Sequence, residues 1–178
     1  MDTGVLMSTE GMLGFPLFSK GKVRDTYVLS DGLLFMVATD RISAFDVVLP
    51  TGIPDKGLVL NWMSGFWFKK TRHLVENHFV DFADAPHVPI IYRQFQVLAN
   101  LPPQIARQAM IVKKAQRIDI ECIVRGYLAG SAWAEYRRNG TVWGQELPRG
   151  FKEGQVLPEP LFTPTTKAEV GHDQNMTH

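Results

Sequence analysis

Apolar and polar residues along the first fifty positions group into short runs that predict β-strands. Lys22–Leu29 and Leu33–Thr39 are rich in Val, Tyr, Phe and Leu, and Ser30-Asp31-Gly32 separates them. A glycine-containing turn between two such runs predicts a β-hairpin. Ala44–Leu49 is expected to form a third strand, so the sequence predicts an antiparallel sheet at its start.

The next segment has the periodicity of an amphipathic helix. Its apolar residues fall at i, i+3, i+4, i+7 and i+8, and they are Val59, Trp62, Met63, Phe66 and Trp67. This spacing puts them on one stripe of a helix. An aromatic stripe of this kind is expected to face the protein core.

Further strands are expected at Val88–Tyr92, Phe95–Leu98 and Met110–Lys114. Ile118–Arg125 alternates well enough to predict one more strand, with apolar side chains on one face. Cys122 falls on that apolar face, so we expect a packed thiol there.

The second half of the chain begins with a helix and continues into an irregular segment. Ser131 is a good N-cap and Gly140 fits the position just after a helix, so a helix is expected between them. Leu147–Thr166 holds several prolines and glycines. It is expected to be a long irregular loop, which in a compact domain is usually functional or disordered.

Composition narrows the class of protein. The chain has 178 residues, and 19 Lys plus Arg against 18 Asp plus Glu give a formal net charge of +1. This lacks the basic excess that drives binding to a nucleic-acid backbone. One cysteine excludes an internal disulfide, and no apolar run is long enough to span a bilayer. We expect a cytoplasmic protein that binds small molecules.

Three segments have the chemistry of an anion site. Ser19–Asp25 places three cations around Gly21, which suits a polyphosphate, although a solvated basic edge strand has the same pattern. Asp40–Asp46 follows an apolar strand, where binding sites are often built, but its Asp and Ser also suit a simple turn. Glu121–Ser131 joins a strand carrying Arg125 to a helix N-terminus. The alternative there is a structural Glu–Arg pair and an ordinary cap.

A fourth segment follows the proline-rich loop. Phe162–Glu169 and His172-Asp173 bring hydroxyls, a lysine, carboxylates and a histidine close together in sequence. Two adjacent ligands are a poor metal signature, so a surface loop is the default interpretation.

Four of these segments, in order, resemble one enzyme family. Glu121–Trp133 is similar to the first signature of the phosphoribosylaminoimidazole-succinocarboxamide synthases (SAICAR synthetases). Gly21–Asp25 looks like the family's nucleotide-phosphate loop, and Asp40–Asp46 and Leu157–Pro164 match as well. Each short motif is weak alone, but their order makes the resemblance specific.

The resemblance implies an ATP-dependent ligase of purine biosynthesis that uses Mg²⁺. The enzyme would join L-aspartate to carboxyaminoimidazole ribotide (CAIR), with an acyl phosphate as intermediate, and release SAICAR, ADP and phosphate. The implied fold is α+β. An antiparallel nucleotide-binding lobe with a kinase-like outline would occupy residues 1–115. Residues 116–178 would form the beginning of a second α/β lobe, which is truncated.

The same resemblance implies roles for individual residues, while the catalytic residues stay unknown. The expected ATP contacts are Lys20, Gly21, Lys22, Val23, Arg24 and Lys113. The expected substrate contacts are Asp40, Arg41, Ser43, Asp46, Glu121, Arg125, Ser131 and Lys167.

The sequence also departs from the family pattern. Gln174 stands where the family usually has Glu, and the second signature, Asp-x-Lys-x-Glu-Phe-Gly, is absent. We therefore expect roughly the N-terminal two thirds of the family pattern, with the metal site after residue 178. An inactive nucleotide- or ribotide-binding fragment is the alternative. A kinase-like phosphotransferase is disfavoured because His-Arg-Asp and Asp-Phe-Gly triplets are absent.

Overall fold

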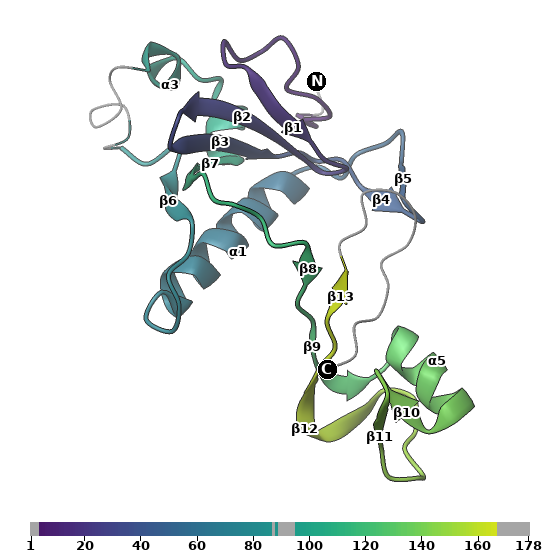
Figure 1. The fold of residues 1–178 in the computed structure, drawn as a ribbon. Coiled ribbons are helices and arrows are strands. Elements are labelled where there is room, and N and C mark those ends of the chain that lie inside the picture. The colour runs from purple at the N-terminus through teal and green to yellow at the C-terminus, as the bar shows by residue number, and fades with distance from the viewer. Residues whose placement is uncertain (1–3, 87, 89–94, 167–178) are drawn as a thin grey trace. The chain divides into compact units, whose positions relative to one another are not determined.

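The computed structural model describes residues 4–86, 88 and 95–166 (Figure 1). The chain divides into two compact units, Met1–Ala115 and Gln116–His178. Within the described residues, no helix combines the length and the apolar character needed to cross a membrane.

A five-stranded sheet forms the centre of the first unit. Its order is β1-β2-β3-β7-β6 and every neighbouring pair is antiparallel. The expected hairpin is confirmed, since β2 pairs with β3 across the turn at Asp31-Gly32. β6 was not predicted. The strands are β1 Leu17–Lys20, β2 Arg24–Ser30, β3 Leu33–Ala38, β6 Phe79–Phe82 and β7 Ala109–Lys113.

Side chains alternate between the two faces of this sheet, so each face has its own apolar cluster. Phe35 and Ile111 point to one face, where they pack with Leu6 of the N-terminal segment and Ile105 of a short helix. The opposite face carries a smaller cluster of Leu34, Met110 and Val112, against which Phe68 packs. Both faces of the sheet are therefore covered.

Helix α1 (Lys56–Thr71) lies along the second face of the sheet (Figure 1). The side that it turns inward differs from the one expected. Its buried residues are Gly57, Asn61 and Gly65. A Cβ on Gly65 would lie 2.1 Å from the Phe82 ring, so only glycine allows this approach. The predicted core stripe is therefore wrong in its direction. Its members are each more than half exposed: Val59, Trp62, Met63, Phe66 and Trp67.

The third strand expected at Ala44–Leu49 is also wrong. The chain forms a small separate hairpin there, with β4 (Ser43–Ala44) paired to β5 (Val47–Val48). Phe45 and Asp46 both have positive φ, 48° and 65°, which turns the chain back within two residues. The backbone turn therefore ends the strand before it can join the sheet.

Two expectations between the strands have different outcomes. Phe95–Leu98 was expected as a strand, but α3 (Gln96–Ala99) is helical and α4 (Pro103–Arg107) follows it. An apolar run this short does not distinguish helix from strand by its period. Of the strand expected at Val88–Tyr92, all but Val88 lies outside the described residues.

The second unit is built from helix α5 (Gly130–Asn139) and short paired strands. β9 pairs with β12, β8 with β13 and β10 with β11, all antiparallel. Leu128, Tyr136, Val142 and Trp143 belong to its apolar core. The strands are β8 Ile120–Glu121, β9 Val124–Leu128, β10 Thr141–Val142, β11 Gln145–Glu146, β12 Gln155–Phe162 and β13 Thr165–Thr166.

Three expectations for this unit need correction. The strand expected over Ile118–Arg125 is broken between β8 and β9, and Cys122 in the break is exposed, not packed. The segment Leu147–Thr166 is not irregular, because it contains β12. The pairing of β12 with β9 shifts between Val156 and Leu161, so the prolines between them are accommodated.

The predicted helix is confirmed, with a changed beginning. Ala129 is the N-cap residue and Ser131 lies in the first turn, so Ser131 is not the cap. Gly140 ends the helix as expected, with φ 75° and its amide bonded to the Tyr136 carbonyl at 2.8 Å.

Candidate functional site

The basic loop, residues 20–24, connects β1 to β2 in the first unit. Gly21 donates its amide to the Arg24 carbonyl at 2.7 Å, which closes the turn. An added Cβ on Gly21 would lie 3.2 Å from that carbonyl oxygen, a tight contact that favours glycine. The exposed cationic side chains of Lys20, Lys22 and Arg24 surround this turn.

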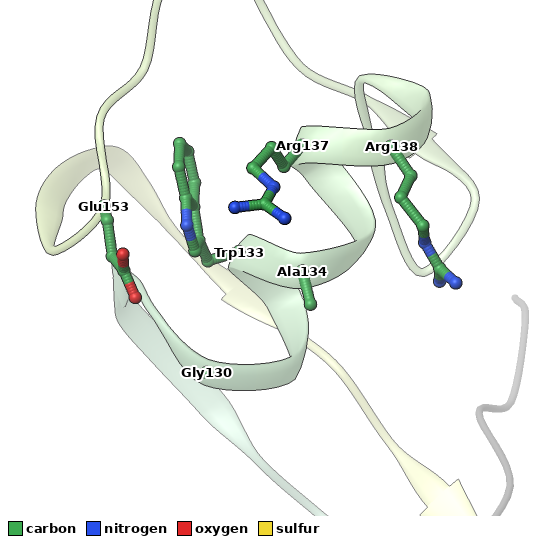
Figure 2. A pocket seen from close by; sticks show the side chains of 6 residues that line it. All are labelled: Gly130, Trp133, Ala134, Arg137, Arg138 and Glu153. Atoms are coloured by element: carbon green, nitrogen blue, oxygen red, sulfur yellow. The ribbon is translucent and has the colours of Figure 1, made fainter.

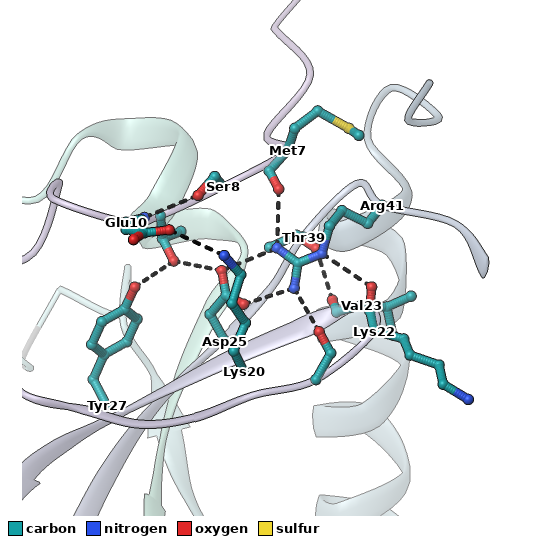
Figure 3. Close-up of polar contacts among 12 residues, drawn as sticks. Met7, Ser8, Glu10, Lys20, Lys22, Val23, Asp25, Tyr27, Thr39 and Arg41 are labelled. Carbon is teal, nitrogen blue, oxygen red and sulfur yellow. Dashed lines mark hydrogen bonds and ion pairs between the residues drawn. The ribbon is translucent and has the colours of Figure 1, made fainter. Parts of the chain in front are cut away.

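Arg41 holds the basic loop from the protein interior (Figure 3). Its Nε donates to the Lys22 carbonyl at 3.0 Å and its Nη2 to the Gly21 carbonyl at 2.9 Å. Nη1 donates to the Met7 carbonyl at 3.0 Å. Both Nη atoms also donate to the Asp25 carboxylate, at 2.7 and 3.1 Å. All five N–H donors of the guanidinium are therefore used within the protein.

Asp25 completes this buried ion pair. Burial raises the pKa of its carboxyl, but hydrogen bonds from Arg41 and Thr9 and the nearby charges of Arg41 and Lys20 bring that pKa below the usual value. The Thr9 hydroxyl donates to Asp25 at 2.8 Å and lies 2.7 Å from the Tyr27 hydroxyl. Asp25 is therefore ionised and fixed in position opposite Arg41.

The carbonyl groups of the basic loop are turned toward the protein. Gly21 and Lys22 accept from Arg41, and the Val23 carbonyl accepts from both the amide and the hydroxyl of Thr39. In the described part of the chain, the amides of Lys22 and Val23 have no protein acceptor. A loop with its carbonyls engaged and its amides available resembles the backbone nests that bind anions.

Positive charge accumulates beside this loop. Arg24 Nη2 lies 3.5 Å from Ser64 Oγ on α1. Burial lowers the pKa of Lys56, at the start of α1, and the charges of Arg24 and Arg41 lower it further, while Asp40 raises it. Lys56 was not found from the sequence, because only the fold brings the helix start near the loop. A polyphosphate would relieve this repulsion.

Asp40, one of the predicted substrate contacts, has a structural role in the first unit. Its side chain is fully buried. One carboxylate oxygen accepts from the Leu6 amide at 2.7 Å, and the other accepts from the Gly57 amide and from Gln108 Nε2, both at 2.8 Å. Asp40 therefore supplies a negative charge at the N-terminus of α1, where the free amides favour it.

The fold brings some of the other predicted contacts of the first unit to the basic loop and leaves others distant from it. Asp46, at the tip of the β4–β5 hairpin, forms an ion pair with Lys22 of the basic loop, and Ser43 lies half-buried in β4. Lys113 is opposite Leu33 at the other end of β3 from Ala38, the partner of Arg24. Its backbone is about 16 Å from that rung, so the fold does not bring it to the basic loop.

Arg125 and Ser131 meet in the second unit. Arg125 Nη2 donates to Ser131 Oγ at 3.1 Å, and its Nε donates to Thr163 Oγ1 at 3.1 Å. The guanidinium lies over the Trp143 ring, 5.2 Å from its centroid. Trp143 and Thr163 were missed, and the turn sequence Trp143-Gly144 was the available signal for the first. Arg125 is thus held beside the open N-terminus of α5, an arrangement suited to a phosphate group.

A surface hollow lies along the same helix (Figure 2). Gly130, Trp133, Arg137 and Glu153 are among its lining residues. Figure 2 shows the Arg137 side chain directed toward Trp133, while Arg138 points the other way. The helix therefore adds Arg137 and Arg138, basic groups that lie outside the sequence motifs.

Of the remaining predicted contacts, one lies on a different strand from Arg125 and one is outside the described residues. Glu121 is on β8, opposite Thr165, and does not share a continuous strand with Arg125. Lys167 lies outside the described residues, as do His172 and Asp173. Among the described residues, no group of three or more His, Cys, Asp or Glu side chains is arranged to hold a metal ion.

The sequence and the fold together define the class of protein to which this chain belongs. The family model described as SAICAR synthetase matches residues 17–178. The chain belongs to the SAICAR synthetase family.

Particular members of the family are closely similar. The phosphoribosylaminoimidazole-succinocarboxamide synthase of Thermodesulfovibrio yellowstonii is 51% identical over 92% of this chain and 53% of its own length. That of Elusimicrobium minutum is 47% identical over 93% of this chain and 54% of its own length. The chain spans about half the length of these relatives, not the two thirds expected from the motifs.

Solved structures agree with the fold. SAICAR synthase from Saccharomyces cerevisiae, complexed with SAICAR, has a TM-score of 0.76 and 43% identity, covering 96% of this chain and 55% of that one. A SAICAR synthetase in complex with ADP has a TM-score of 0.65 at 23% identity, covering 91% and 55%. The SAICAR synthase-like fold with a five-stranded antiparallel sheet is therefore confirmed.

Proposed function

We propose that this chain provides the phosphate-binding parts of an ATP-dependent ligase that joins L-aspartate to CAIR. In this reaction the γ-phosphoryl group of ATP passes to the CAIR carboxylate and ADP leaves. The aspartate amine then attacks the acyl phosphate, loses a proton and releases phosphate as the amide bond of SAICAR forms. The observation that carries the proposal is the basic loop, with its carbonyls bound inward and its cations outward, in a chain of this family.

The first unit would be the nucleotide-binding lobe, kinase-like in outline. Lys20, Lys22 and Arg24, with Lys56, would neutralise the phosphates of ATP, and the amides of Lys22 and Val23 would bind phosphate oxygens. Such fixed charges stabilise the transferred phosphoryl group without reorganisation during the reaction. Asp46 would exchange its ion pair with Lys22 when the nucleotide binds.

The second unit, the proposed beginning of an α/β lobe, would bind the ribotide phosphate. Arg125, Ser131 and the first-turn amides of α5 are the groups that would contact it. The yeast relative's complex with SAICAR supports a ribotide ligand for this family. The described side chains do not form a Mg²⁺ site, so no step is assigned to a metal held by them.

A second candidate function is nucleotide or ribotide binding without turnover. It is favoured by one observation, that the chain spans about half the length of its relatives. Both candidates use the same phosphate-binding residues and differ only in catalysis.

The test is release of ADP from ATP, Mg²⁺, CAIR and L-aspartate, measured with all substrates and with each one omitted. The Thermodesulfovibrio yellowstonii relative serves as the positive control. Turnover by this chain that needs every substrate supports the ligase. ADP and SAICAR binding without turnover supports the binding function, and the absence of both binding and turnover contradicts both.

A further inference from the structure

The buried Asp25–Arg41 pair is connected to the basic loop through the guanidinium of Arg41. Its side chains are 2% and 7% exposed. A buried ion pair is weak evidence for stability, because removing two charges from water offsets much of their attraction. Arg41 nevertheless binds two consecutive carbonyls of the basic loop, those of Gly21 and Lys22.

We propose that Arg41 is a positioning residue for the phosphate chain of a nucleoside di- or triphosphate. It turns the Gly21 and Lys22 carbonyl oxygens away from the ligand, so that the loop presents amides and cations to the phosphates. This inference rests on the proposed function, since it concerns how the same loop binds a nucleotide.

The physical reason lies in the sign of the backbone charges. A carbonyl oxygen is partly negative and repels phosphate, whereas an amide N–H attracts it. Without Arg41, the two carbonyls need other donors, and the nearest replacement is water at the exposed surface of the loop. The oxygens would then point toward the side from which the phosphates approach.

Asp25 serves the same end by fixing Arg41. It accepts from both Nη atoms, which sets the plane of the guanidinium, and it is itself held by Thr9, next to Tyr27 (Figure 3). Arg41 does not need to touch the nucleotide for this role, because all five of its donors are already used. A lysine could retain the positive charge but could not bind both carbonyls and both carboxylate oxygens.

The test compares binding of adenosine, AMP and ADP to the 178-residue chain by calorimetry. The variants are Arg41→Lys and Arg41→Met, each checked for folding by circular dichroism and thermal melting. Val112→Ala is the matched control, because Val112 is buried in β7 away from the basic loop and its loss destabilises the same unit.

The expected result is that adenosine binds folded wild type and Arg41→Lys equally, while ADP affinity falls roughly tenfold in the variant, the size of one charged hydrogen bond. Val112→Ala should keep the wild-type preference for ADP over adenosine. A purely structural role predicts instead that Val112→Ala loses the preference as Arg41→Lys does, and that result overturns the inference.

The remaining outcomes separate the inference from the proposed function. A wild-type chain that prefers ADP, together with a folded Arg41→Lys that retains the full preference, refutes the positioning role alone. A wild-type chain without any preference for ADP over adenosine refutes the nucleotide-phosphate assignment, and the positioning role with it. If Arg41→Met does not fold, Arg41→Lys decides the question.

Discussion

Asp40 and Arg41 are adjacent residues of opposite charge that hold different parts of the first unit. Asp40 binds the start of α1 and the N-terminal segment, while Arg41 binds the basic loop and Asp25. The sequence left this motif open between a binding site at the end of an apolar strand and a simple turn. It did not indicate that both side chains are buried, since the partners come from distant positions.

Asp25 predicts how stability depends on pH. Its folded-state pKa lies below the ordinary value of an aspartate carboxyl, so its contribution to stability is fully present above that ordinary value. The contribution is lost as pH falls through the lower folded pKa. Urea melts at pH 7 and at stepwise lower pH should show this acid-dependent loss in wild type.

The variant Asp25→Asn should lose about 3 kcal/mol at pH 7, because Arg41 is left buried without its charge partner. The free energy of unfolding of this variant should also change less as the pH is lowered into the acid range. Asp119→Asn, which breaks an exposed pair with Arg117, is the control. It should leave the free energy of unfolding and its acid dependence nearly unchanged. An acid dependence that is the same in wild type and Asp25→Asn would refute the assignment.

At the scale of elements, α1 shows what periodicity can and cannot establish. The pattern correctly predicted a helix, because the apolar residues recur at helical spacing. It gave the wrong inward face, because periodicity does not show that two glycines and an asparagine allow the closest approach to the sheet. Asn61 adds specificity by donating to the Arg107 and Ala109 carbonyls, both at 3.1 Å.

The glycine face predicts a large effect from a small substitution. Gly65→Ala should destabilise the first unit by about 2 kcal/mol through overpacking, although alanine favours helix formation. The new Cβ would meet the Phe82 ring, which must move. Chemical denaturation measures the change, with Lys70→Ala on the exposed side of α1 as control. A stabilised Gly65→Ala would show that α1 does not approach β6 this closely.

The exposed stripe of α1 predicts the opposite behaviour. Met63 and Trp67 are each 52% exposed, so Met63→Gln with Trp67→Gln should change stability by less than about 1 kcal/mol. Binding of a hydrophobic dye should fall, because the two substitutions remove apolar side chains from an exposed apolar patch to which the dye can bind. Leu34→Ala, a buried substitution, should instead lower stability. A large loss of stability in the double variant would mean that the stripe is core after all.

At the scale of the molecule, short sequence motifs predicted more of the structure than the distribution of apolar and polar residues over longer segments did. The basic loop, the β2–β3 hairpin and the meeting of Arg125 with Ser131 followed from short sequences, because turns and helix ends have local signatures. The bulged strand β12 did not, since Pro158 and Pro160 suggest a loop until their pairing partner is known. Lys56 and Trp143 come close to the candidate site residues only through folding.

The proposed function requires that the two units bind two different phosphates, that of a nucleotide and that of a ribotide. Calorimetric titration with ADP and with SAICAR tests it in the chain and in two matched variants, Lys22→Met and Arg125→Met. Arg117→Met is the control, because its exposed side chain pairs with Asp119 and is not one of the proposed phosphate contacts.

We predict that Lys22→Met lowers the affinity for ADP about tenfold and leaves the affinity for SAICAR unchanged. Arg125→Met should lower the affinity for SAICAR about tenfold and leave the affinity for ADP unchanged. The control should bind both ligands as wild type does. If either substitution weakens both ligands equally, or neither weakens its own, the division of phosphate binding between the two units is wrong.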